Sequence, residues 1–250
     1  MVNSHIQMPN CILKNFCDNQ NWLYYYDFGE KKIRRGHAKT LYTQTGYYSD
    51  EVEQILCDEI EAPLGILVKY IKTISIEKTD NPPGNYSEVA FNYLYSLLSR
   101  SPHMIENIKR HSFYYQFMSD IIDPVYNHDY ATVGGIAAAN NIDLLKDKLS
   151  VTFLLNRSRE DFVLPTGGVI QLENRLICPV TPDKAIIFDD KEVLLEDGDR
   201  ALIDYYETDD EEAVHIINLK AFIGEKSRDG KYVVSNNKEL LEMLKTELGL

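Results

Sequence analysis

The first hundred residues contain basic and titratable side chains that could together bind an anion. Arginine presents a planar guanidinium that bonds a carboxylate or phosphate through two parallel hydrogen bonds, and histidine titrates near neutral pH. If these side chains meet in one cleft, they predict a pocket for a phosphate-bearing ligand in which a histidine serves as general base. The candidate ligand-binding residues are His5, Lys14, Arg34, Arg35, His37 and Arg100.

Each of these side chains also has an ordinary structural explanation. Five of the nine residues from Lys31 to Lys39 are basic, and this stretch is expected to be the second strand of a β-hairpin. Lysine and arginine often protect an exposed edge strand from pairing with another sheet. His5 and Lys14 would then be solvated, and Arg100 would bond the last carbonyl groups of a helix. The sequence leaves both explanations open.

Acidic residues outnumber basic ones, and most of the excess lies in the second half of the chain. The chain has 39 Asp and Glu against 26 Lys and Arg, which gives a formal net charge of −13. A general coat on nucleic acid is therefore not expected, because it requires clustered positive charge. An acidic surface instead speeds association with a basic protein partner. The candidate interaction residues are Glu207, Asp209, Asp210, Glu211 and Glu212, with solvated loops as the alternative.

Sequence motifs of common cofactor sites and catalytic centres are absent. The chain has no P-loop, no dinucleotide-binding glycine motif, no zinc-protease helix motif and no hydrolase nucleophile elbow. Its four cysteines form no Cys-x-x-Cys pair, and its acidic runs lack the spacing of a calcium-binding loop. We therefore predict no cofactor and no metal. Reduced cysteines, no signal peptide and no apolar run of roughly 18–20 residues predict a cytoplasmic protein without a membrane span.

Apolar spacing predicts a hairpin and then helices in the first half of the chain. Residues 22–26 and 31–39 are expected to be the two strands of the hairpin. Ser49 is expected to cap a helix that runs to about Ile71 and is kinked at Pro63. Further helices are predicted from Ser87, from Pro102 towards Met118, and over residues 136–149.

The second half of the chain predicts short strands followed by helices. Short β-prone runs at residues 151–155, 162–164, 168–172, 176–180, 185–188 and 192–195 indicate a mainly antiparallel sheet. A helix over 211–225, a strand over 231–235 and a capped helix over 238–248 follow. The predicted class is α+β, with an N-terminal β-hairpin and helical bundle followed by a mainly antiparallel sheet with C-terminal helices. We expect a single domain over residues 1–250, with lobes at about 1–149 and 150–250.

Four segments of the chain follow a recognisable family pattern. The first is His5-Ile6-Gln7-Met8-Pro9, followed by Leu13-Lys14-Asn15-Phe16, and the second is the aromatic segment and helix with a Glu-Ala-Pro step at residues 43–63. The third is the helix end Arg100-Ser101-Pro102. The fourth is the sheet, with Cys178-Pro179-Val180-Thr181-Pro182, Asn218 and Tyr232-Val233-Val234-Ser235. Together these segments resemble the family of domain of unknown function 4238, which is mostly bacterial.

Two positions depart from the pattern of that family. Three residues separate His5 from Pro9, where the family has two. The residues from Pro165 to Gly168 stand where the family commonly has Ser-Asp-Asn-Pro, so the aspartate of that motif is missing here. The resemblance implies a shared fold and no particular reaction, because none of its motifs belongs to a defined chemistry.

Two classes of function remain open. The favoured class is an intracellular binding or interaction protein, such as a component of bacterial defence or toxin immunity, because the sequence shows no nucleophile–base pair. The alternative is a nuclease-like enzyme that acts on a phosphate-bearing ligand or nucleic acid in a basic N-terminal pocket. Charge reversal at Arg34 and Arg35 would abolish the second function, and neutralising residues 207–212 would abolish the first.

Overall fold

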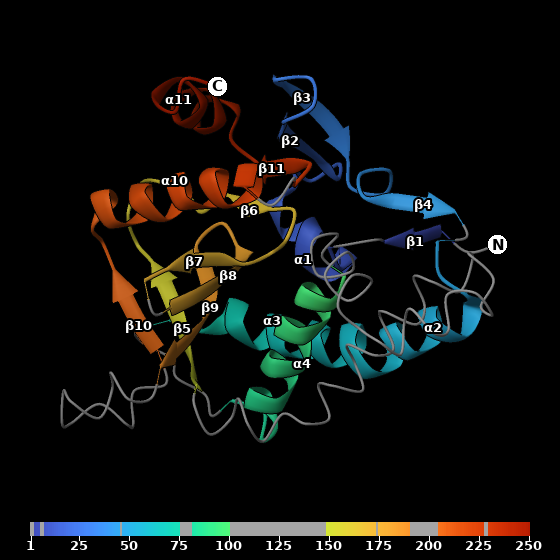
Figure 1. Ribbon diagram of the computed structural model, residues 1–250. Coiled ribbons are helices and arrows are strands. Elements are labelled where there is room, and N and C mark those ends of the chain that lie inside the picture. Colours follow the sequence, from blue (N-terminus) through green and yellow to red (C-terminus); the bar gives the residue numbers. More distant parts are fainter. Residues whose placement is uncertain are drawn as a thin grey trace, which may run out of the picture.

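Two larger β-sheets and one two-stranded sheet organise the fold in the computed structural model, which describes residues 3–5, 8–45, 47–75, 82–100, 149–173, 175–190, 205–227 and 230–250. Neighbouring strands of the five-stranded sheet are antiparallel, except that β10 runs parallel to β5. The α+β class with a mainly antiparallel sheet is therefore confirmed. The strand order is β10-β5-β9-β8-β7 (Figure 1), formed by β5 (Leu149–Asn156), β7 (Ile170–Leu172), β8 (Arg175–Thr181), β9 (Lys184–Asp190) and β10 (Tyr205–Thr208).

The second sheet is built around the predicted hairpin. Strands β2 (Trp22–Asp27) and β3 (Lys32–His37) are antiparallel, and β11 (Tyr232–Ser235) pairs with the other side of β2. The short strand β6 (Leu164–Pro165) completes the order β3-β2-β11-β6. This sheet therefore joins strands from both ends of the chain. The basic strand β3 lies at its edge, which agrees with the structural explanation for the basic residues.

The first long helix changes its hydrogen-bond pattern just before Pro63. Ser49 caps α2 (Asp50–Ile55) as predicted, because its side chain accepts a hydrogen bond from a backbone N–H of the first turn at 3.3 Å. The chain continues as a π-helix, η2 (Leu56–Glu61), and then as α3 (Ala62–Thr73). Proline lacks an N–H and its ring crowds the carbonyl group four residues earlier, so the helix widens just before Pro63, where the sequence predicted a kink.

The prediction that Ser87 is the N-cap of the next helix is wrong. Helix α4 (Tyr86–Ser99) already contains Ser87 in its first turn. The carbonyl oxygen of Asn85 accepts a hydrogen bond from the N–H of Val89 at 3.1 Å, so helical bonding begins before the serine. The helix predicted at residues 102–118, the strand at 192–195 and all but the last residue of the helix predicted at 136–149 lie outside the described residues, and Leu149 begins β5.

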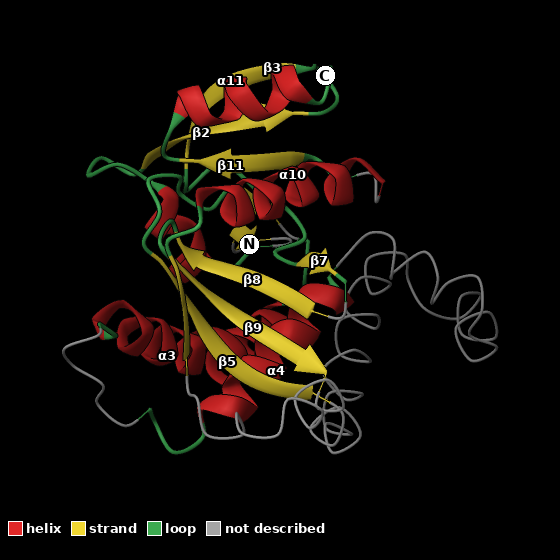
Figure 2. Cartoon of the chain, turned by 90° about the vertical axis from the view of Figure 1, so that its left-hand side faces the viewer, coloured by secondary structure: helices red, strands yellow, loops and turns green. Residues whose placement is uncertain are grey.

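Helices cover both faces of the five-stranded sheet. In Figure 2, α3 and α4 lie behind β5, β9 and β8, and Phe188 of β9 packs in the core on that side. Its neighbour Ile187 points to the opposite face and packs with α10 (Glu211–Ser227), because successive strand residues alternate between faces. Helix α11 (Lys238–Glu247) packs against β2 and β11, and the cap that was predicted for this helix is supplied by Asn237. Among the described helices, none has the length and apolar character needed to cross a membrane.

Candidate functional site

The arginines of the hairpin are paired with acidic residues at the surface. Arg34 forms an ion pair with Glu30, and Arg35 forms one with Asp18 at 2.8 Å. The guanidinium of Arg35 also lies over the ring of Trp22, 5.2 Å from its centroid. Because Arg34 and Arg35 are exposed and neutralised by neighbours, their placement fits edge protection better than an anion-binding cleft.

The remaining basic candidates of the first forty residues lie at different places. His37 ends β3, and its Nδ1 accepts a hydrogen bond from the backbone N–H of Lys39 at 3.1 Å. Lys14 is exposed in the 3-10 helix η1 (Lys14–Phe16). His5 ends β1 (Asn3–His5), opposite Thr43 in β4 (Thr43–Thr45), and its side chain lies outside the described part.

Arg100 differs from the other candidates because it is buried. It follows the last residue of α4 and is only 1% exposed. Its Nη1 lies 3.6 Å from Oε1 of Glu61, and the three nitrogens of its guanidinium have no hydrogen-bond partner in the described part of the chain. Figure 1 shows β3 at the top of the molecule, whereas the end of α4 that precedes Arg100 lies lower down, beside α1. The structure therefore does not bring Arg34 and Arg35 into one cleft with Arg100.

Helix α1 (Asn10–Leu13) and the π-helix place a thiol and a carboxyl group beside Arg100. Burial raises the pKa of the Cys11 thiol to about 12, the charge of Glu61 adds to this shift and Arg100 opposes it. Burial likewise raises the pKa of Glu61 against the effect of the guanidinium, and Glu53 adds to the rise. Cys11 is therefore a protonated thiol at neutral pH, which is unsuited to nucleophilic catalysis.

The opening segment of the family resemblance and the turn at Pro165–Gly168, where the chain departs from the family, meet beside α4. The hydroxyl of Tyr93 in α4 lies 4.0 Å from the sulfur of Met8 in the opening segment. A Cβ atom on Gly168 would lie 2.8 Å from both terminal methyl groups of Leu97 and 3.0 Å from the terminal methyl of Met8. The turn at Pro165–Gly168, the opening segment and α4 are therefore in direct contact.

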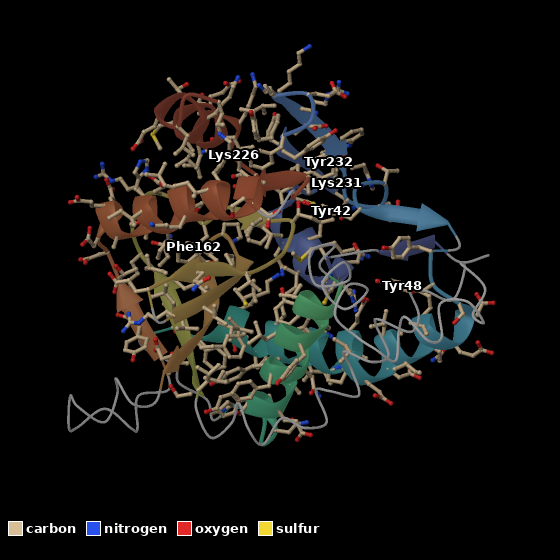
Figure 3. All side chains as sticks on the ribbon, in the orientation of Figure 1. Tyr42, Tyr48, Phe162, Lys226, Lys231 and Tyr232 are labelled. Atoms are coloured by element: carbon tan, nitrogen blue, oxygen red, sulfur yellow. The ribbon has the colours of Figure 1, made fainter. Side chains whose placement is uncertain are left out.

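A carboxylate reaches the turn in which the family aspartate is missing. Glu225 of α10 is buried, and its Oε1 accepts a hydrogen bond from the N–H of Gly167 at 2.8 Å. Thr166 in the same turn bonds both backbone groups of Tyr232, whose ring packs against that of Tyr42 at 5.4 Å (Figure 3). Sequence reasoning missed Glu225 because it is far away in the chain and resembles an ordinary polar position of a helix.

A pocket of about 430 Å³, here called the α10 pocket, opens between α10 and the five-stranded sheet. Its walls are mainly aliphatic, and Ile216 is 41% exposed at the pocket. Arg175 is held in place at the pocket by an ion pair with Asp189 at 2.7 Å and by the ring of Tyr206. The lining consists of Leu154, Leu172, Glu173, Arg175, Ile177, Ile187, Tyr206, Glu207, Thr208, Ala213, Ile216 and Ile217.

The predicted acidic interaction residues gather at the rim of the α10 pocket. Glu207 lines the pocket and forms an ion pair with Arg157 at 3.1 Å. Asp210 caps α10, because its Oδ1 accepts hydrogen bonds from the N–H groups of Glu212 and Ala213 at 2.9 and 3.2 Å. Asp209, Glu211 and Glu212 are exposed around that cap. Thr208 and Ala213, which flank these residues in the chain, also line the pocket, so the acidic stretch borders an aliphatic pocket that the sequence did not predict.

His215, which sequence reasoning also missed, bridges two carboxylates on one side of α10. Its Nδ1 lies 3.0 Å from Oε2 of Glu160, and its Nε2 lies 2.7 Å from Oε2 of Glu247 in α11. Burial disfavours the imidazolium, but the hydrogen bonds to Glu247 and Glu160 outweigh it and raise the pKa of His215. The pair of contacts links α10, α11 and the segment that follows β5.

We expect the free energy of unfolding to fall as the pH rises through the raised pKa of His215. A group with a raised pKa in the folded state contributes fully below its unfolded pKa of about 6.5 and loses that contribution above the folded pKa. Urea unfolding between pH 5.5 and 8.5 should show a decline of about 0.5–1 kcal/mol that is missing in His215→Gln. Equal slopes in both proteins would contradict this role.

Comparison with known proteins adds no information on these sites. No protein-family model, curated protein or solved structure matches the chain. The resemblance to the family of domain of unknown function 4238 therefore stays a prediction. Within the described ranges, no cluster of His, Cys, Asp or Glu residues is suited to hold a metal ion.

Proposed function

We propose that this protein is a binding protein that captures a basic protein partner through the α10 pocket and its acidic rim. The observation that carries the proposal is the position of the pocket directly beside the acidic start of α10. Its volume of about 430 Å³ lies within the range of typical ligand sites, roughly 300–1,000 Å³. An aliphatic side chain of the partner would fill the pocket, and lysine or arginine beside it would meet the rim.

The charges at the rim favour a basic occupant. Glu207 and Glu211 are partly neutralised, by Arg157 at 3.1 Å and by Arg159 at 4.0 Å. The other acidic side chains at the rim have no ion-pair partner among the described residues, and Arg175 is already bonded to Asp189. These acids are Glu173, Asp209, Asp210 and Glu212. A surface of this kind attracts a basic partner, increases the rate of association and disfavours acidic competitors.

The lining of the pocket supports binding rather than catalysis. Among the described residues that form it, there is no histidine, cysteine or serine to serve as base or nucleophile. An apolar centre surrounded by charged groups is the usual anatomy of a protein interface. An immunity-type or regulatory protein that neutralises a basic partner would use such a surface, and this is the kind of component that we propose.

Reversing two charges at the rim is expected to weaken the binding of a basic peptide at least tenfold. The probe is a peptide of about 15 residues that carries one central leucine among lysines, arginines and serines. Glu207→Lys combined with Glu212→Lys should remove the electrostatic attraction to the basic peptide and the preference for it over an acidic one. Ile216→Asn should weaken binding by disturbing the apolar contact in the pocket alone. Isothermal titration calorimetry gives the affinities, and methyl NMR should show shifts at Ile177, Ile187 and Ile216.

Matched controls separate this surface from general acidity. Glu59→Lys combined with Glu242→Lys changes the net charge equally at exposed positions away from the pocket and should leave the affinity unchanged. Replacing the leucine of the peptide with serine should weaken binding, and replacing its basic residues with glutamate should abolish it. If both double variants lose affinity equally, or if the leucine is irrelevant, the pocket is not the binding site.

A further inference from the structure

Helix α10 carries two exposed isoleucines on the side that points away from the core. Glu212, Ile216, Lys220 and Ile223 are spaced four, four and three residues apart, so they lie along one side of the helix, here called the outer stripe. Ile216 is 41% exposed and Ile223 is 47% exposed, although both are large aliphatic residues. Figures 1 and 2 show α10 between α11 and the five-stranded sheet, so the outer stripe is open to a partner.

The outer stripe is continuous with the α10 pocket. Ile216 belongs to both, because it also lines the pocket. Ile223 follows seven residues later in the same helix, which is two turns or about 10.5 Å along the axis. A partner that places one apolar side chain in the pocket can therefore place a second against Ile223 if it runs along α10. An α-helix has this spacing, since its residues seven positions apart lie on one face.

The charge along α10 changes sign from its start to its end. Glu211 and Glu212 lie in the first turn, and Lys220 and Lys226 lie in the second half. Both lysines are exposed, and neither forms an ion pair with another residue that the structure describes. A helix antiparallel to α10 would place its C-terminal end over the glutamates and its N-terminal end over the lysines. Because helices favour basic residues in their last turn and acidic residues in their first, this direction satisfies the charges of both helices at once.

We propose that the partner binds through an amphipathic helix that lies antiparallel along the outer stripe. This helix carries two apolar residues seven positions apart and basic residues towards its C-terminus. The inference rests on the proposed function, because the apolar residue nearer the C-terminus is the one that fills the α10 pocket. The other apolar residue contacts Ile223, and an acidic residue between the two faces Lys220.

A second copy of this chain fits the outer stripe less well than a different helix. In an antiparallel pair of α10 helices related by a two-fold axis, Ile216 of each copy would meet Ile223 of the other. The axis would then pass next to Lys220, so the two copies of this lysine would face each other. Like charges at that distance repel, whereas a different helix can place an acidic residue there.

Calorimetry with two helical peptides tests the contact with Ile223. The parent peptide of about 18 residues carries glutamates, then two leucines seven positions apart with a glutamate midway between them, then lysines. Replacing its first leucine with serine should weaken binding about tenfold. Ile223→Asn should weaken the parent peptide to the same extent and leave the affinity of the one-leucine peptide unchanged. Ile66→Asn makes the same change at a residue of α3 that is 61% exposed and should affect neither peptide.

A spin label at one end of the parent peptide tests its direction. A label at the N-terminus should broaden the methyl signals of Ile223 more than those of Ile216, and a label at the C-terminus should do the reverse. Lys220→Glu should weaken the parent peptide about three- to tenfold, because two glutamates would then face each other. A peptide with lysine in place of its central glutamate should restore the affinity for this variant.

The contradicting outcomes distinguish this inference from the proposed function. If the one-leucine peptide binds but the second leucine and Ile223→Asn have no effect, no helix lies along the outer stripe, and the α10 pocket remains a binding site. If no peptide binds, both proposals are wrong. The opposite pattern of broadening would overturn the antiparallel direction. If sedimentation shows that the chain alone forms dimers and that Ile223→Asn abolishes them, a second copy occupies the outer stripe instead of a different helix.

Discussion

Replacing Gly168 with alanine is expected to lower the free energy of unfolding by about 2–4 kcal/mol. Gly168 has φ of 68°, a left-handed conformation that is strained for alanine. The added Cβ would also lie 2.8 Å from both terminal methyl groups of Leu97 and 3.0 Å from that of Met8. Both side chains are buried in close-packed surroundings, so they have little room to move.

A second glycine separates the two contributions to this loss. Gly249 has nearly the same φ of 62°, but a Cβ there would meet no atom within 4 Å. Gly249→Ala should therefore cost only the backbone strain, about 1 kcal/mol. Urea unfolding of the three proteins measures both effects. If Gly168→Ala and Gly249→Ala lose the same amount, the contact with Leu97 and Met8 contributes nothing to stability.

Replacing Asn218 with alanine is expected to have an effect of similar size, about 2–4 kcal/mol. Asn218 of α10 is fully buried, and its Oδ1 accepts a hydrogen bond from the N–H of Val163 at 2.9 Å. Its Nδ2 donates to the carbonyl oxygen of Asp161 at 2.9 Å and to Oε1 of Glu160 at 2.8 Å. Truncation would leave these groups without partners in a place that water does not readily reach.

Two further variants identify the cause of the loss at Asn218. Asn218→Leu restores the volume without the hydrogen bonds, so it should be about as unstable as the alanine variant. Asn19→Ala removes the same side chain from an exposed loop and should change the free energy of unfolding by less than about 0.5 kcal/mol. Recovery of full stability in Asn218→Leu would show that a cavity, and not the lost hydrogen bonds, explains the alanine result.

The elements that local patterns determine could be predicted from the sequence. The hairpin, the cap at Ser49, the antiparallel strands after residue 149 and the C-terminal helices all follow from apolar spacing and turn residues within short windows. The insertion of β11 between β2 and β6 and the parallel pairing of β10 with β5 could not be predicted. These pairings join segments that are far apart in the chain, and no local pattern specifies the partner of a strand.

In the candidate sites, too, local features could be predicted and contacts between distant segments could not. The acidic stretch at residues 207–212 could be recognised because consecutive charges are visible in the sequence. The pocket beside it could not, because Ile177 and Ile187 alternate as in any core strand. Arg100 was recognised by its residue type at a helix end. Its burial was not predicted, because burial depends on the elements that pack around α4. The bridge from Glu160 through His215 to Glu247 spans three distant segments and gave no sequence signal.

The position of β11 has a consequence for synthesis on the ribosome. Strand β2 is rich in aromatic residues. The basic strand β3 covers one edge of β2, and only β11 covers the edge on the other side. About two hundred residues separate β2 from β11, which at 5–20 residues per second corresponds to roughly 10–40 s. During that interval the nascent hairpin exposes an unpaired aromatic edge, so binding by a chaperone at β2 would protect the chain from aggregation until β11 is made.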